Sequence, residues 1–161
     1  AAQALSRGTQ PPTLSVGNLY LVERTTLVAL RGEVQYQPLG AMTFSRIEGE
    51  RPLQVGDRVR TGWFGRAVIE VPTHGSRFEL FPLTQAVLAG DQPGVLIELK
   101  RGRLWAVFEA ITGQEERLVA TPGAILAVRG TAYGLEVDRS ANVELAVFEG
   151  TVEVRSRLPE A

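Results

Sequence analysis

Apolar and polar residues alternate along most of the chain, which is the pattern of β-strands with one buried face. Four segments share one design, in which the alternation runs up to a charged residue and a glycine and then resumes: residues 27–37, 97–108, 125–137 and 144–154. In three of them the positions two and four residues after the glycine are apolar: Val34, Tyr36, Leu104, Ala106, Val152 and Val154. Because strand side chains alternate with a period of two, we expect each pair to lie on a buried face.

The segment around Gly130 departs from this design. Its bulky residues fall at Tyr133, Leu135 and Val137, one position out of step with the other three segments. Such a slip predicts a β-bulge at Gly130, because glycine adopts backbone conformations that other residues resist. An ordinary two-residue hairpin is the alternative, and Glu149-Gly150 predicts a hairpin at its own position.

Arg129-Gly130-Thr131 places a charged residue in the middle of an apolar strand. We interpret the three residues as a structural corner, in which Gly130 permits the slip and Thr131 favours an extended backbone. A buried, unpaired arginine would be costly, so we expect Arg129 to bind a carboxylate or free carbonyl groups. Replacing Arg129 by alanine is then expected to destabilise the domain.

No window of the sequence has the length and composition of a sustained helix. We therefore expect one all-β domain of roughly 10–14 short strands over residues 16–155, with little or no helix. A two-sheet β-roll or sandwich and a short, irregular β-helix both remain open. Residues 1–15 read as a flexible leader and residues 156–161 as a tail.

Composition narrows the classes of function. The 161 residues, 44% of them hydrophobic, suit one domain with a real core. The net charge of −1 gives no overall attraction to nucleic acid. Uninterrupted apolar stretches fall far short of the ~20 residues that a membrane-spanning helix needs. The chain has no cysteine, which excludes disulfides and thiolate metal sites.

The small, polar, proline-broken amino terminus is typical of a mature exported protein, so we expect an extracytoplasmic location: periplasmic, secreted or at the cell surface.

Residues with catalytic chemistry are scattered. His74 is the only histidine and stands in a turn-forming string, without the partners that a metal site or a proton relay needs. Five glutamates fall within predicted strands, where alternation with valine and leucine indicates the solvent face rather than a paired-carboxylate site: Glu70, Glu79, Glu98, Glu136 and Glu144. We expect a non-enzymatic protein with no catalytic residues, no cofactor and no metal.

One segment gathers basic and aromatic side chains. Arg58, Arg60, Trp63 and Arg66 lie within nine residues of one another, and guanidinium groups beside an indole could bind a carboxylate, a phosphate or a sugar face. The commoner explanation is a strand corner at which arginine stems cover Trp63 and their charged heads reach water. We keep these four residues as a candidate binding surface.

Three sequence words resemble the FecR domain, which occurs in bacterial iron-citrate regulators and in many other envelope proteins. The first is Leu53-x-x-Gly56-Asp57-x-Val59-x-Thr61 followed by Arg66-Ala67. The second joins Thr121-Pro122 to Val128-Arg129-Gly130-Thr131, and the third is Glu149-Gly150-x-Val152-x-Val154. With "GEVQY" near the start, the resemblance covers about residues 22–155. The sequence departs from the FecR pattern at His74, where aspartate is usual, and at Tyr133, where phenylalanine is common.

The resemblance implies an extracytoplasmic sensory module in envelope signal transduction. In the regulators, such a module senses a ligand-loaded outer-membrane transporter and signals to an extracytoplasmic-function sigma factor. We therefore expect an interaction module whose partner is an envelope protein or a cell-wall polymer. The alternative is a small-molecule or saccharide binder, or a hydrolase, using Trp63, Trp105 and neighbouring arginines or glutamates. A concave pocket with an indole face favours the alternative, and a flat, partly apolar strand edge favours a protein partner.

Overall fold

The structure, a computed structural model, describes residues 24–89, 94–108 and 117–156, which form a 12-stranded sheet and one short 3-10 turn. The first strands are β1 (Thr26–Arg31), β2 (Val34–Gln37), β3 (Ser45–Arg46), β4 (Glu50–Pro52), β5 (Arg58–Thr61) and β6 (Arg66–Val71). After the turn at Pro72–His74 come β7 (Ser76–Leu80), β8 (Gln85–Leu88), β9 (Val95–Phe108), β10 (Arg117–Ala120), β11 (Ala124–Val137) and β12 (Val143–Ser156). The prediction of an all-β fold of about this many strands is confirmed.

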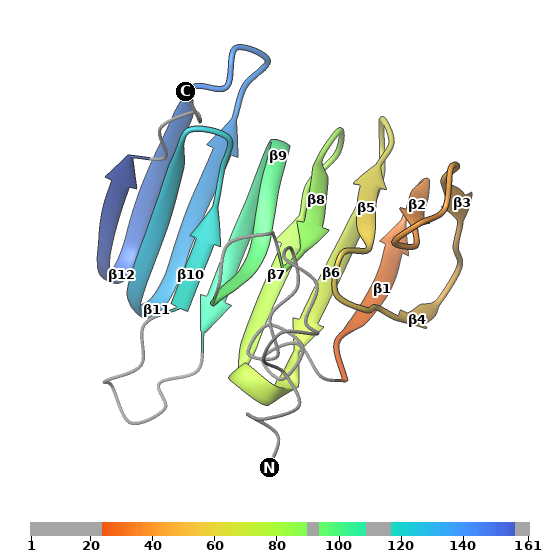
Figure 1. The fold of residues 1–161 in the computed structure, drawn as a ribbon, viewed down its shortest axis with the longest axis horizontal. Coiled ribbons are helices and arrows are strands. Elements are labelled where there is room, and N and C mark those ends of the chain that lie inside the picture. The colour runs from red at the N-terminus through yellow and green to blue at the C-terminus, as the bar shows by residue number, and fades with distance from the viewer. Residues whose placement is uncertain (1–23, 90–93, 109–116, 157–161) are drawn as a thin grey trace, which may run out of the picture.

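The sheet folds back on itself and forms two layers. Its order is β3-β2-β5-β8-β9-β7-β6-β1-β4, and β9 is a strand that belongs to both layers. The first half of β9 pairs with β8 and the second half pairs with β7. In the same way β1 continues into β2 and β5 into β6, with a bend at a glycine between them. Figure 1 shows these bent strands one after another along the long axis, from β12 at the left to β2 and β3 at the right.

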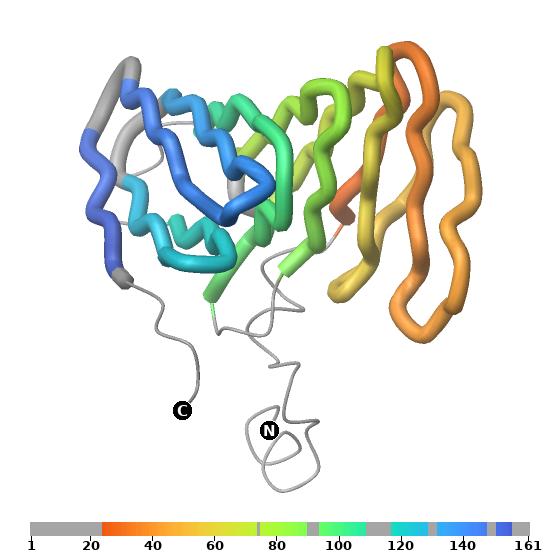
Figure 2. Tube along the Cα trace, turned by 90° about the horizontal axis from the view of Figure 1, so that it is seen from above, coloured from red at the N-terminus to blue at the C-terminus, as the bar shows by residue number. Residues whose placement is uncertain are grey.

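The carboxy-terminal strands curl round at the other end of the molecule. β10 runs parallel to the first half of β9 and antiparallel to the first half of β11, whereas the second half of β11 pairs directly with β9. β12 accompanies β11 along its length and pairs with no other described strand. Seen from above, the chain from β9 to β12 closes into a ring-like end (Figure 2).

Alternate side chains of the two layers meet in one core. Its centre includes three aromatic rings, with the centroid of Phe108 5.7 Å from those of both Phe78 and Tyr133. Burial of the alternating positions is confirmed for four of the six named from the sequence: Val34, Tyr36, Leu104 and Ala106. Val152 is partly buried and packs against the core. Burial of Val154 was a wrong prediction, since its exposed fraction is 56%. It lies on β12, the edge strand, beyond which no described strand covers it.

The β-bulge at Gly130 is confirmed. Gly130 pairs with Gly150, and the next pair, Ala132 with Glu149, leaves Thr131 out of the register. A second shift then passes over Phe148, so that the register is the same on both sides of the two bulges.

The hairpin predicted at Glu149-Gly150 is wrong. β12 runs unbroken through both residues, and the chain reverses between Asp138 and Asn142 instead, where the Asp138 N–H donates to the Asn142 carbonyl at 3.0 Å. Because the two bulges lie opposite each other, both strands bend at the same place and stay paired. Gly150 therefore marks a bend within β12 and not the end of a strand.

The predicted domain limits fall mostly outside the described residues. The leader 1–15, residues 16–23 of the domain and residues 157–161 of the tail lie there. Ser156, which we assigned to the tail, still belongs to β12. The side chains of Arg129, Thr131 and His74 also lie outside what the structure describes, so the expected partner of Arg129 stays a prediction.

Candidate functional site

The Leu53-x-x-Gly56-Asp57 word forms a tight turn that leads into β5. The Asp57 N–H donates to the Gln54 carbonyl at 3.0 Å, and Gly56 has φ +89°, a conformation that suits glycine in a type II turn. The buried Asp57 carboxylate accepts the N–H of Gln54 at 2.9 Å and that of Leu39 at 3.0 Å. Asp57 therefore joins the loop before β3 to the start of β5.

Thr61, at the end of β5, begins a line of buried hydroxyl groups. Its Oγ1 donates to the Phe81 carbonyl at 2.6 Å and accepts the Thr84 N–H at 2.9 Å. The Thr84 hydroxyl accepts the Arg103 N–H at 3.0 Å and donates to the Arg103 carbonyl at 3.1 Å. The two threonine side chains thus provide hydrogen-bond partners for backbone groups of Phe81, Thr84 and Arg103, where the strands bend and sheet pairing is interrupted.

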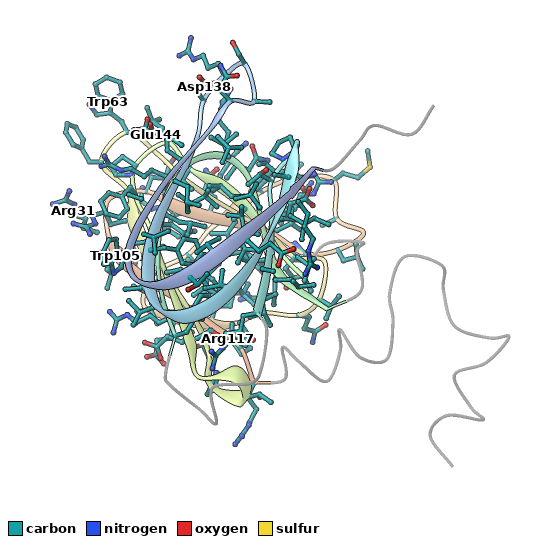
Figure 3. The ribbon with its side chains drawn as sticks, turned by 90° about the vertical axis from the view of Figure 1, so that its left-hand side faces the viewer. Arg31, Trp63, Trp105, Arg117, Asp138 and Glu144 are labelled. Carbon is teal, nitrogen blue, oxygen red and sulfur yellow. The ribbon has the colours of Figure 1, made fainter. Side chains whose placement is uncertain are left out.

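The bend between β5 and β6 presents two aromatic side chains to solvent. Trp63 and Phe64 are 70% and 69% exposed, and their rings meet edge to face with centroids 6.1 Å apart. Leu83, 54% exposed, lies beside them because its N–H donates to the Gly62 carbonyl at 3.1 Å. Figure 3 shows Trp63 projecting away from the body of the protein. We call Trp63, Phe64 and Leu83 the aromatic corner.

Backbone hydrogen bonds and close contacts at glycines define the bend that carries the aromatic corner. The Gly62 N–H donates to the Glu33 carbonyl at 2.9 Å and the Gly65 N–H to the Gly62 carbonyl at 3.0 Å. A β-carbon at Gly32 would lie 2.5 Å from the Phe64 carbonyl oxygen, so only glycine allows the bend after β1 to approach the bend after β5 this closely.

The structure separates the four residues of the candidate binding surface. Arg58 and Arg60 lie on the outer face of β5, whereas Arg66, past the corner, lies on the outer face of β6, where it forms an ion pair with Glu79. The arginine stems do not cover Trp63. Arg60 instead stacks on Phe44, with its guanidinium carbon 3.9 Å from the ring centroid. Arg66 stacks on Phe81 at 4.7 Å.

The other residues of the FecR-like motifs lie at turns and bulges of the backbone. The buried Thr121 hydroxyl accepts the Ala124 N–H at 3.0 Å and so closes the turn between β10 and β11, with Pro122 exposed in that turn. Gly130 and Gly150 pair with each other next to the two bulges described above. These words therefore mark bends of the chain.

A family model described as FecR protein matches residues 57–153. The chain belongs to the FecR family. The match begins at Asp57 and ends within β12, so it includes the aromatic corner, both bulges and most of the two-layered sheet. The FecR family is regulatory and non-enzymatic, and its members are typically associated with the cell envelope. No curated protein and no solved structure matches the chain.

The FecR sheet also carries a surface groove on the outer side of β9 and β11. Its volume is about 330 Å³, and its lining includes Trp105, Arg103, Glu136 and Glu144. Gly134 lies directly opposite Trp105 in the register, and the missing side chain leaves space beside the indole. Figure 3 shows Trp105 and Glu144 on the same side of the molecule.

Two carboxylates of this groove face each other. Glu136 pairs directly with Glu144 across β11 and β12, an arrangement of like charges that destabilises a sheet. Glu136 also lies directly opposite Arg103 of β9. Of the other strand glutamates, Glu79 is paired with Arg66, and the Glu98 carboxylate lies 3.2 Å from the Lys100 ammonium. The expectation that all five glutamates lie on the solvent face is wrong for Glu98, which is buried. Alternation in the sequence placed both Glu136 and Glu144 on strands, but their juxtaposition depends on the register.

Among the described residues, no three His, Cys, Asp or Glu side chains are grouped so that they could hold a metal ion. Within the same residues, none of the secondary-structure elements is a helix long and apolar enough to cross a membrane.

Part of the exposed surface was not predicted from the sequence: Phe64 and Leu83. Phe64 stands between Trp63 and Gly65, and an aromatic pair enclosed by glycines is a readable signal for an exposed corner. Leu83 carries no such signal, because its place beside Trp63 depends on the bond to Gly62.

Proposed function

We propose that this FecR chain is a non-enzymatic, extracytoplasmic sensory module that recognises a partner protein of the cell envelope through the aromatic corner. The observation that carries the proposal is the exposure of two adjacent aromatic rings on a bend closed by backbone hydrogen bonds. Aromatic residues are enriched among those that contribute most to binding at protein interfaces, where they bury large apolar surfaces. A preformed corner also loses little conformational entropy when a partner binds.

The envelope location and the signalling role rest on the family. Membership of the FecR family suggests a signal-transduction regulator domain. Such a domain would need a surface that binds another protein. The aromatic corner is such a surface, and it lies inside the matched segment. Transmission of the signal toward a sigma factor belongs to the same proposal.

Site-specific photocrosslinking in intact host cells tests the partner surface. A photoreactive phenylalanine analogue at position 64 is expected to give a discrete protein adduct in the envelope fraction, and Trp63→Ala is expected to remove the adduct. The same analogue at Met42 is the matched control, since Met42 is an apolar side chain 92% exposed on another loop. Equal adducts from both positions, or adducts only with cytoplasmic proteins, would contradict the proposal.

The groove at Trp105 supports a second candidate function, the binding of a small molecule or a saccharide. An indole beside a space lined by Arg103, Glu136 and Glu144 has both an apolar surface and polar groups that could orient a ligand. Titration calorimetry with soluble peptidoglycan fragments distinguishes the two candidates. Binding that is lost in Trp105→Ala and kept in Trp63→Ala would favour the groove.

A further inference from the structure

A row of arginine and glutamine side chains crosses one layer of the sheet, over the five neighbouring strands β3, β2, β5, β8 and β9. Arg46 of β3 lies opposite Gln35 of β2, and Gln35 lies opposite Arg60 of β5. Arg60 lies opposite Gln85 of β8, and Gln85 lies opposite Arg101 of β9. Directly opposed residues of antiparallel strands point to the same face, so these five side chains share one surface. We call them the arginine ladder.

The geometry of the sheet sets the spacing of the ladder. Neighbouring strands lie about 4.8 Å apart, so the arginines on every second strand are about 10 Å apart at the backbone. Arg46, Arg60 and Arg101 are all exposed, and Gln35 and Gln85 are partly exposed between them. The result is a line of guanidinium groups with an amide group in each interval.

The middle of the ladder is held in place by its neighbours. The Arg60 Nε donates to the Gln35 Oε1 at 2.6 Å, and the guanidinium stacks on Phe44. Among the described residues no hydrogen bond is made by its two terminal nitrogens, which form a fork of donors. A carboxylate binds such a fork through two parallel hydrogen bonds. Preorganisation of this kind lowers the entropy that binding costs.

Positive charge on this face exceeds the negative charge that contacts it. Five cationic side chains lie on or beside the ladder: Arg46, Arg58, Arg60, Lys100 and Arg101. The described carboxylates within ion-pair distance of them are Glu98, beside Lys100, and Glu33, 3.9 Å from Arg46. The face is therefore basic although the whole chain has a net charge of −1.

We propose that the arginine ladder binds a linear acidic polysaccharide, one whose carboxylates are separated by uncharged, hydroxyl-bearing sugars. Each arginine of the ladder binds a carboxylate, and the intervening glutamine amides exchange hydrogen bonds with the hydroxyl groups. A polymer with a carboxylate on alternate sugars repeats its charge on a scale comparable with the spacing of the ladder. This surface is distinct from the aromatic corner, so the inference does not depend on the proposed function.

Two other polyanions fit the face less well. Duplex nucleic acid carries one phosphate per ~3.4 Å of each strand, which is a much denser charge than that of the ladder. Single-stranded nucleic acid is bound by stacking its bases on free aromatic rings, whereas the Phe44 ring is covered by Arg60. An anionic membrane surface is bound by proteins that also insert apolar side chains, and the ladder itself consists of arginine and glutamine.

Binding of a fluorescently labelled hyaluronan oligosaccharide, which has a carboxylate on alternate sugars, tests the proposal by anisotropy at low and moderate salt. We expect saturable binding that weakens as salt rises, because the arginines form ion pairs with the polymer. The triple variant R46Q/R60Q/R101Q is expected to weaken binding at least tenfold. A matched control, R31Q/R77Q/R139Q, removes three exposed arginines from other surfaces and is expected to stay within about twofold of the original chain.

A variant with one substitution separates loss of binding from loss of folding. Arg101→Gln removes one exposed arginine with no described carboxylate in ion-pair distance, so melting is expected to be unchanged while binding falls severalfold. The proposal would be overturned by no binding of hyaluronan at low salt, or by equal losses in the two triple variants. Tighter binding of single-stranded DNA or of phosphatidylglycerol vesicles than of hyaluronan would assign the face to those partners and overturn it too.

Discussion

Gly65 lies so close to Glu33 that a β-carbon at position 65 would be 2.3 Å from the Glu33 carbonyl oxygen. This contact is between backbones, so it cannot be relieved by rotating a side chain. It joins the bend after β1 to the bend after β5 and thereby sets the position of the aromatic corner.

Gly65→Ala is expected to destabilise the protein by about 3 kcal/mol, because the backbones of two bends would have to move apart. Urea unfolding followed by circular dichroism measures the change. Gly123→Ala is the matched control, since nothing lies within 4 Å of a β-carbon there. The control is expected to be neutral or slightly stabilising. Similar losses in both variants would mean that the close approach has no special cost.

Asp57→Ala is expected to cost about 3 kcal/mol, because two backbone N–H groups, of Leu39 and Gln54, would lose a charged acceptor. Asp57→Asn keeps one acceptor oxygen and is expected to lose less. The midpoint of urea unfolding distinguishes the two variants. An alanine variant as stable as the original chain would show that water replaces the carboxylate without cost.

Tyr133→Phe is expected to stabilise the protein by about 1 kcal/mol. The Tyr133 hydroxyl is buried and has no hydrogen-bond partner among the described residues, and a buried, unsatisfied hydroxyl destabilises the folded state. Burial also raises the pKa of Tyr133, which indicates the same desolvation. Tyr36→Phe is a control at a residue that lines a surface groove, and no gain is expected there. A lower melting temperature for Tyr133→Phe would reveal a partner for the hydroxyl.

The β11–β12 hairpin is expected to weaken in acid. Hydrogen bonds from the Asn142 backbone and side chain, and from the Ser140 N–H, hold the pKa of Asp138 below its ordinary value. A lowered folded-state pKa means that the carboxylate stabilises the hairpin above the unfolded pKa, and that this contribution is lost as pH falls through the folded value. The difference in melting temperature between the original chain and Asp138→Ala should therefore be present at pH 7 and vanish in acid. A difference independent of pH would contradict this account.

The strands, the core and the bulge could be predicted from the sequence because each depends on neighbouring residues. Alternation placed Val34 and Leu104 in the core, since a strand directs its side chains to opposite faces whatever strand it meets. The one-residue slip at Gly130 indicated a bulge for the same local reason. The sequence words of the FecR pattern also mark local bends, such as the turn at Gly56.

Only the tertiary structure decided which strands lie beside one another. The exposure of Val154 follows from the edge position of β12, and the separation of Arg66 from Arg60 follows from the fold of the sheet into two layers. The arginine ladder joins Arg46 to Arg101, which are far apart in the sequence, through cross-strand register. The hydrophobic pattern of a strand determines which face it buries, and so restricts the register. Which strand lies opposite depends on how all the strands pair.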